Sequence, residues 1–187
     1  MADLMKKAIR QTFMEMLEEV PLNKITVKEL TNKCGINRNS FYYHYQDIPQ
    51  LIEEIVKTEC DEAIKRYPTL DSLEECINLA TEFSIARRRE VLHIYNSVNR
   101  DIFERYLWEM CDYGITQYIN SLLKDKDIDE GDKVILIRYH KCECFGIIID
   151  WLDSGMQENI MESYKRILEI KKDQLYLSIE RLEKSAE

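Results

Sequence analysis

The sequence is poor in glycine and proline, with 5 Gly and 3 Pro among 187 residues. So few turn-forming residues argue against a β-sandwich, a barrel or a glycine-rich phosphate loop, and the 45% of hydrophobic residues argues against a disordered chain. No apolar run approaches the roughly 18 residues of a membrane span. The composition therefore favours a compact, all-helical protein without a membrane segment.

The first 20 residues have no uninterrupted apolar stretch, because Lys6, Lys7 and Arg10 stand among the apolar positions. A secretory signal peptide is therefore not expected. Six cysteines at irregular spacing, in a chain without an export signal, are typical of reduced and mostly buried thiols rather than of a disulfide framework. Both observations predict a cytoplasmic protein.

The net charge of −9 argues at first against a nucleic-acid partner. The charge is unevenly distributed, however. Between residues 24 and 45 four basic residues, Lys24, Lys28, Lys33 and Arg38, stand against the single acid Glu29. Because phosphate binding depends on the local field rather than on total charge, this basic segment keeps a nucleic-acid partner open.

Capping residues mark three helix starts in the N-terminal third. Thr26 followed by Glu29 forms a capping box, Gly35 marks a helix end, and Asn37 and Asp47 are two further caps. Together with an amphipathic pattern before Pro21, these signals predict four helices, over 4–20, 27–34, 38–44 and 48–67. The first three helices, with a glycine-containing turn between the second and third, are typical of a helix-turn-helix unit.

The predicted helix over 38–44 is too short to be stable alone. Phe41 and Tyr45, four residues apart, can face inward and anchor it. Its other side chains are polar or aromatic and rich in hydrogen-bond donors, which indicates a surface that contacts something outside the chain.

Apolar spacing after Pro68 predicts five more helices, over 72–86, 89–96, 100–123, 130–154 and 157–182, or about nine in the whole chain. The charged stretch over 124–132 is expected to be a surface loop. The apolar stripes of the last two helices are wide enough to pack on each other and on a second copy. The residues expected at such a dimer interface are Ile148, Ile149, Leu152, Leu168 and Leu175.

Residues 25–51, ITVKELTNKCGINRNSFYYHYQDIPQL, resemble the TetR family of bacterial transcriptional regulators. The later segment FGIIIDWLDSG is similar to the penultimate helix of a subset with a small effector domain. The resemblance implies a helix-turn-helix DNA-binding domain over 1–46. It also implies a helical effector-binding and dimerisation domain over 47–187, entered through the helix 47–67.

The function that this resemblance implies is sequence-specific DNA binding rather than catalysis. The protein is expected to be a ligand-responsive repressor that acts as a homodimer on a palindromic operator. Its partners would be double-stranded DNA, a second copy and an unknown small-molecule effector, with no cofactor, metal or membrane. No catalytic residues are predicted, since the sequence has no Ser/His/Asp order, phosphate loop or HExxH motif.

The resemblance also assigns roles to individual residues. Arg38 and Asn39 take the places from which the family reads base edges, and Tyr43 reads bases or touches the sugar-phosphate backbone. Asn37 is the cap of the recognition helix, and Thr26 is a cap that also touches a phosphate. The full set expected to bind DNA is Thr26, Lys28, Asn37, Arg38, Asn39, Ser40, Tyr42, Tyr43 and His44.

The sequence departs from the family pattern at two positions. The family commonly has glycine where Asn39 stands, so Asn39 either crowds the groove or adds a specific contact. The family also commonly has lysine where Ile48 stands, and that phosphate contact is lost. Binding would then depend more on helix dipoles and on Lys24 or Lys28.

Two groups of residues beyond the DNA-binding segment have alternative interpretations. His93, Tyr95, Phe103, Trp108 and Cys111 either line a ligand pocket or form a plain core. His140, Cys142 and Cys144 offer zinc or copper ligands, which gives an alternative function as a metal or thiol sensor or as a helical adaptor that does not bind DNA. On a helix Cys142 points away from the other two, so a shared metal would need a break in the helix, and buried or interfacial thiols are the plainer interpretation.

Overall fold

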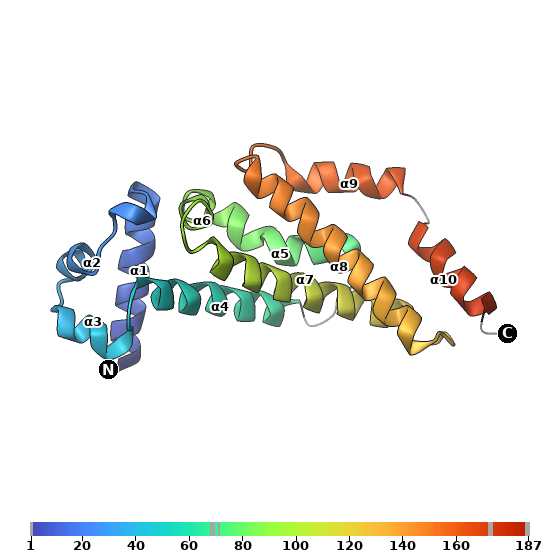
Figure 1. Ribbon diagram of the computed structural model, residues 1–187, viewed down its shortest axis with the longest axis horizontal. Coiled ribbons are helices and arrows are strands. Elements are labelled where there is room, and N and C mark those ends of the chain that lie inside the picture. The colour runs from blue at the N-terminus through green and yellow to red at the C-terminus, as the bar shows by residue number, and fades with distance from the viewer. Residues whose placement is uncertain (1, 68–69, 71, 172–173, 186–187) are drawn as a thin grey trace. The chain divides into compact units, whose positions relative to one another are not determined.

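The computed structural model describes residues 2–67, 70, 72–171 and 174–185. These residues form ten α-helices and one short 3-10 helix and contain no β-strand (Figure 1). The helices in the first half are α1 (Ala2–Glu19), α2 (Val27–Cys34), α3 (Arg38–His44), α4 (Ile48–Arg66) and α5 (Leu73–Ala86), and the 3-10 helix is Leu22–Lys24. Those in the second half are α6 (Arg88–Tyr95), α7 (Arg100–Leu122), α8 (Glu130–Asp153), α9 (Ile160–Ile170) and α10 (Gln174–Ser185). The predicted all-helical class is confirmed.

The chain divides into two compact units. The first contains residues 1–62 and 83–106, and the second contains residues 63–82 and 107–187. Helices α4, α5 and α7 each contribute residues to both units. The first unit thus holds more than the DNA-binding segment 1–46 expected from the sequence, because most of α4, all of α6 and the start of α7 fold with it.

The core of the first unit forms around α1, which packs against α2 and α6, while α2 packs against α3. Phe13 and Leu17 of α1, Leu30 of α2 and Phe41 of α3 are completely buried. The imidazole Nδ1 of His93 on α6 lies 2.6 Å from the backbone oxygen of Leu17, near the end of α1. Apolar burial and this hydrogen bond together fix the position of α1, on which the short helices α2 and α3 depend.

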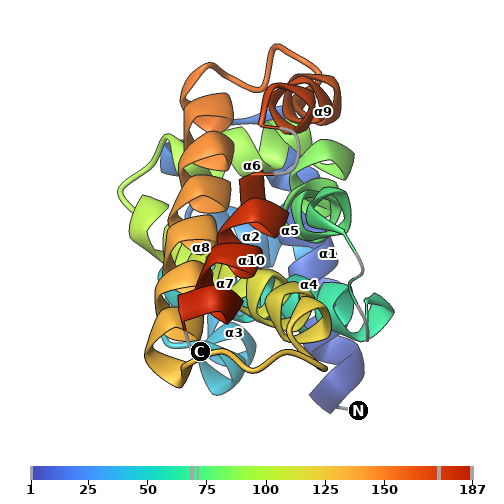
Figure 2. The ribbon, with the colours of Figure 1, turned by 90° about the vertical axis from the view of Figure 1, so that its right-hand side faces the viewer.

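The second unit is built from the rest of α4, the first ten residues of α5, most of α7, and α8, α9 and α10. Leu79, Ile115, Ile148 and Leu152 are buried in its core. Helices α8, α9 and α10 lie next to one another (Figures 1 and 2). In the part of the chain that the structure describes, no helix is both long and apolar enough to cross a membrane.

One predicted helix is wrong. The sequence pattern over 157–182 predicts a single helix, whereas the structure has two, and α9 ends at Ile170 with Lys171 as its C-cap. The described residues therefore form one more helix than predicted. Tyr164, Leu175 and Ile179, spaced 11 and 4 residues apart, are all buried, so the apolar stripe continues in phase across the break and gives no local signal of it.

Candidate nucleic-acid interface

Helix α3 is held at its start by a cap and along its inner face by aromatic side chains. Asn37 Oδ1 accepts a 2.8 Å hydrogen bond from the backbone N–H of Ser40, as an N-cap does. Phe41 is completely buried, and Tyr45, just after the helix, is 1% exposed. The predicted cap and both predicted anchors are confirmed, and the short helix is stabilised by tertiary contacts rather than by its own propensity.

Helix α2 begins with the predicted capping box. The backbone N–H of Thr26 donates to Glu29 Oε2 at 2.9 Å, and the backbone N–H of Glu29 donates to Thr26 Oγ1 at 3.2 Å. The hydrogen bonds from Thr26 lower the pKa of the Glu29 carboxyl. The helix ends at Gly35, whose φ of 72° lies in the left-handed region that favours glycine. The turn into α3 is thus fixed at its start by Gly35 and at its end by the Asn37 cap.

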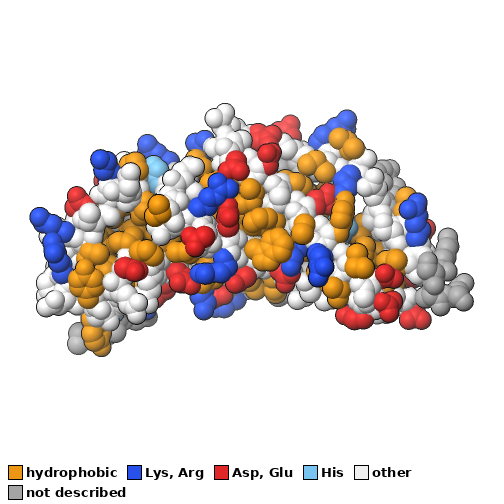
Figure 3. Space-filling model, viewed as in Figure 1, with side chains coloured by type: hydrophobic (Ala, Val, Ile, Leu, Met, Phe, Trp, Pro, Cys, Tyr) orange, Lys and Arg blue, Asp and Glu red, His pale blue; other side chains and the backbone are white. Residues whose placement is uncertain are grey.

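The outer surface of α2 and α3 presents unpaired donors. Arg38, Asn39 and Lys28 are exposed, and none of their side chains makes a hydrogen bond or an ion pair with another described residue. Tyr42 and Tyr43 are 55% and 81% exposed. Lys and Arg side chains also lie along the edge of the first unit where α2 and α3 are found (Figure 3). These side chains are therefore available to an outside partner that accepts hydrogen bonds.

The other residues predicted to bind DNA lie on the same surface but are partly engaged. Thr26 and Asn37 are exposed, and their side chains serve as caps. Ser40 is half-buried, and its hydroxyl donates to Asn37 Oδ1 at 3.1 Å. The half-buried imidazole of His44 contacts the ring of Tyr43 edge-on. The structure thus places the whole predicted set on one two-helix element.

A polar network that the sequence did not predict lies behind α3. Tyr45 donates to Glu54 Oε1 on α4 at 2.9 Å, and Lys6 on α1 contacts Glu54 Oε2 at 2.6 Å. Burial and the hydrogen bond to Glu54 raise the pKa of Tyr45, so its hydroxyl stays protonated. The ammonium of Lys6 also lies 5.3 Å from the centre of the Tyr45 ring. No local pattern connects residues 6, 45 and 54, and only the folded chain brings them together.

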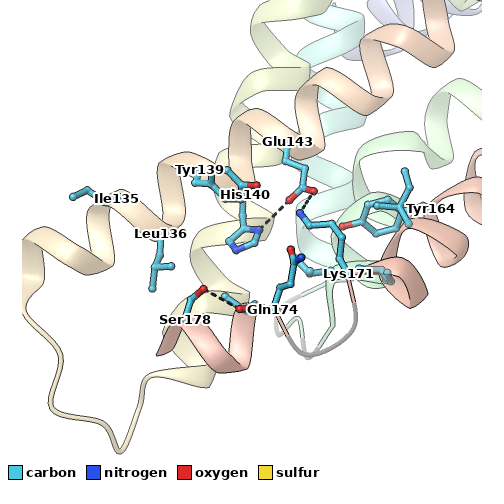
Figure 4. Close-up of a pocket in the computed structure, with 13 residues that line it drawn as sticks. Ile135, Leu136, Tyr139, His140, Glu143, Tyr164, Lys171, Gln174 and Ser178 are labelled. Atoms are coloured by element: carbon cyan, nitrogen blue, oxygen red, sulfur yellow. Dashed lines mark hydrogen bonds and ion pairs between the residues drawn. The ribbon is translucent and has the colours of Figure 1, made fainter. Parts of the chain in front are cut away.

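The five residues predicted as a ligand pocket are divided between the two units. His93, Tyr95 and Phe103 belong to the first unit, whereas Trp108 and Cys111 belong to the second. Tyr95 and Phe103 are buried and form an edge-on pair, which is core packing. The second unit contains an apolar pocket of about 340 Å³ lined by residues of α5, α8, α9 and α10, and none of the five lines it (Figure 4).

The predicted dimer residues fall into two groups. Ile148, Leu152 and Leu175 are buried in the second unit, so their side chains pack within the chain itself. Ile149 and Leu168 are half-buried, and Leu168 lines the apolar pocket. The five residues therefore do not form one open apolar stripe.

Helix α8 has a partly apolar face that is open to solvent. Its members recur at spacings of four and three residues and thus lie on one side of the helix. They are Ile135, Tyr139, Cys142, Gly146 and Ile149, here called the α8 stripe. Ile135 and Tyr139 are 63% and 58% exposed, and a methyl group added at Gly146 would meet no atom within 4 Å.

The proposed metal ligands His140, Cys142 and Cys144 do not converge. His140 and Cys144 are buried, and Cys142 is exposed on the α8 stripe. His140 Nδ1 lies 3.2 Å from Glu143 Oε2, and the Cys144 thiol lies 3.6 Å from that of Cys111. Among the described residues, no group of three or more His, Cys, Asp or Glu side chains could hold a metal ion.

Comparisons with known proteins agree with this architecture. A family model named TetR_C_8 and described as a transcriptional regulator C-terminal region matches residues 71–173. The uncharacterized HTH-type transcriptional regulator YxbF of Bacillus subtilis (strain 168) is 22% identical over 185 residues. That match covers 92% of this chain and 46% of YxbF, so the chain spans about half the length of this curated relative.

A solved structure supports the fold. The dihydroxyacetone kinase operon activator DhaS superposes with a TM-score of 0.71 at 18% identity, over 96% of this chain and 98% of DhaS. The family model covers more than half of the chain and all of α5 to α9, while the helix-turn-helix element precedes it. The chain belongs to the TetR family of transcriptional regulators.

Proposed function

We propose that the protein represses transcription as a homodimer that binds a palindromic operator through α3 and releases it when a small molecule binds. The observation that carries the proposal is the pair Arg38 and Asn39. Both side chains are exposed and make no hydrogen bond with another described residue, although the backbone beneath them is fixed by the Asn37 cap and by buried Phe41. Donors held on a rigid element without a partner in their own chain suit recognition of base edges.

The division of labour among the contacts follows from side-chain chemistry. Arg38 can pair bidentately with guanine and Asn39 with adenine in the major groove. Tyr42, His44 and Lys28 supply donors for phosphates, which fix the register without reading sequence. The proposed role is therefore binding rather than catalysis, and it places the protein with the chromosome in the cytoplasm.

The α8 stripe supports the dimer. Exposed Tyr139 and half-buried Ile149 offer apolar area, and Gly146 between them lets a second helix approach closely. Two copies related by a two-fold axis would present two α3 helices to half-sites about one helical turn, roughly 34 Å, apart.

Ligand response would use the apolar pocket of the second unit. Helices α4, α5 and α7 have residues in both units, and α4, which follows α3 in the chain, is a continuous element through which a change in the second unit can bias the first. A typical coupling of about 1–3 kcal/mol would change operator affinity roughly 5- to 150-fold. DhaS is an operon activator, and fold similarity does not fix the sign of regulation, so the reporter experiment measures whether this protein represses.

The test is selection of bound sequences from random duplex DNA with the full chain, followed by a promoter reporter that carries the selected site. A palindromic consensus, with expression that falls when the protein is present, supports the proposal. Recovery of no consensus at low ionic strength rejects DNA recognition. Increased expression in the presence of the protein rejects repression but leaves DNA recognition standing.

A further inference from the structure

The pocket in the second unit has an apolar wall and a size suited to a small organic molecule. Its volume is about 340 Å³, and Leu136, Ile167, Leu168 and Leu175 are among its lining residues. Two aromatic side chains, Tyr139 and Tyr164, also line it. Such a wall favours a compact, largely apolar ligand with a ring that can pack on the tyrosines.

Three polar side chains stand together at this wall. Glu143 bonds through one carboxylate oxygen to Lys171 and through the other, at 3.2 Å, to Nδ1 of His140 (Figure 4). The hydrogen bond from His140, against the opposing effect of burial, keeps the pKa of Glu143 below its ordinary value, and Lys171 lowers it further. Burial lowers the pKa of Lys171, but the hydrogen bond and charge of Glu143 outweigh that effect and raise it.

Glu143 and Lys171 are therefore both charged and neutralise each other within the wall. A ligand carrying a full charge would find no free counter-charge among these three side chains, and it would lose its hydration on entry. The wall thus selects against carboxylates and ammonium compounds.

Of these three side chains, His140 has hydrogen-bonding capacity that the other two do not use. An ionised carboxylate only accepts hydrogen bonds, so Nδ1, the nitrogen that faces Glu143, carries a proton, and an imidazole with a single proton leaves Nε2 bare. The lone pair is then on Nε2, which points away from Glu143 (Figure 4). The residue is only 8% exposed, and Nε2 makes no hydrogen bond with any residue that the structure describes.

We infer that this pocket binds an uncharged phenolic compound whose hydroxyl donates a hydrogen bond to Nε2 of His140 while its ring packs against the apolar wall. The inference rests on the proposed ligand response, because the bound phenol would be the effector. A hydroxyl donor supplies what Nε2 lacks, and an uncharged ring leaves the Glu143–Lys171 pair intact. A hydrocarbon of the same shape would leave Nε2 without a partner.

Three naphthalene probes of nearly equal size test the inference by calorimetry on the full chain. We expect 2-naphthol to bind at least tenfold more tightly than naphthalene, which has no donor, and than 2-naphthoate, which is charged. His140→Phe should remove the preference for 2-naphthol over naphthalene. Ser178→Ala removes a hydroxyl that lines the pocket and already donates a hydrogen bond to the backbone oxygen of Gln174. This variant should keep the preference for 2-naphthol over naphthalene. Equal binding of all three probes, tighter binding of the naphthoate, or no binding of 2-naphthol would overturn the inference.

Nitrogen-15 spectra of the imidazoles provide a test on the wild-type protein, so the result does not depend on whether a variant folds. The chain has three histidines, so their signals can be assigned by single substitutions. We expect His140 to show an unprotonated Nε2 whose resonance shifts when 2-naphthol is added. A protonated Nε2, or no shift on saturation, would overturn the inference. Operator binding measured on the same sample separates the two proposals, because retained DNA binding without naphthol binding rejects only the phenol site.

Discussion

The hydroxyl of Tyr45, one residue beyond the end of α3, donates a 2.9 Å hydrogen bond to Glu54 on α4. This contact joins the chain just beyond α3 to α4, one of three helices with residues in both units. Lys6 of α1 forms an ion pair with the same carboxylate. The position of α3 is therefore set by a buried aromatic face and by one carboxylate shared between α1 and the chain just beyond α3.

Removing the hydroxyl should loosen this junction. We expect Tyr45→Phe to lower the free energy of unfolding by about 1–2 kcal/mol, since a hydrogen bond to a charged group is worth roughly 1.5–3 kcal/mol and Lys6 still pairs with Glu54. Urea unfolding followed by circular dichroism measures the change. Lys57→Ala, at an exposed position of α4 with no partner among the described residues, is the control and should change stability by less than about 0.5 kcal/mol. Equal losses in both variants would show that the hydroxyl is not stabilising.

The same carboxylate should make stability depend on pH. Burial tends to raise the pKa of Glu54, but hydrogen bonds from Lys6 and Tyr45, with the charges of Lys6 and Arg10, lower it overall. The stabilisation is therefore fully present above the carboxyl's unfolded-state pKa and is lost as pH falls through the lower folded-state pKa. We expect the stability difference between wild type and Glu54→Gln to be largest near neutral pH and to shrink below about pH 4. A difference that is constant from pH 3 to pH 7 would contradict this.

The cap of α3 can be separated from its role at the DNA surface. Asn37→Ala should lower the free energy of unfolding by about 1 kcal/mol, whereas Asn37→Ser and Asn37→Asp keep a capping oxygen and should stay close to wild type. On DNA, Asn37→Asp should bind more weakly than Asn37→Ser, because it adds a negative charge to the surface proposed to face phosphates. The measurements are urea unfolding and fluorescence anisotropy. Indistinguishable DNA affinities for Ser and Asp would place this cap away from the phosphates.

The sequence predicted the DNA-binding element closely because its signals are local. The bounds 27–34 and 38–44 agree with the structure, since Thr26, Gly35 and Asn37 act within three or four residues of themselves. The break after Ile170 and the pocket around His140 were not predictable in this way. The apolar stripe continues through the break, and the pocket combines residues from α5, α8, α9 and α10 that only packing brings together.

Base-reading and phosphate contacts should respond differently to substitution. Arg38→Ala should weaken binding to the selected operator by about 1–3 kcal/mol and relax one base preference, with little change on random duplex. Lys28→Ala should weaken both duplexes alike and lower the salt slope by about 1. Anisotropy titrations at several salt concentrations measure both quantities. Parallel losses for the two variants on both duplexes would show that Arg38 does not read bases.

The open position at Gly146 gives a direct test of the α8 stripe. A Cβ added there would meet no atom within 4 Å, and replacing a helical glycine favours the helix by about 0.5–1 kcal/mol, so Gly146→Leu should not harm the folding of the chain itself. If a second α8 approaches at this point, the leucine should hold the two helices apart. We expect a monomeric mass by light scattering and a loss of operator affinity, because a single α3 contacts one half-site. Ser121→Leu, which adds the same side chain to an exposed position of α7, should leave the mass and affinity unchanged. An unchanged dimer mass for Gly146→Leu would place the interface on another face of the molecule.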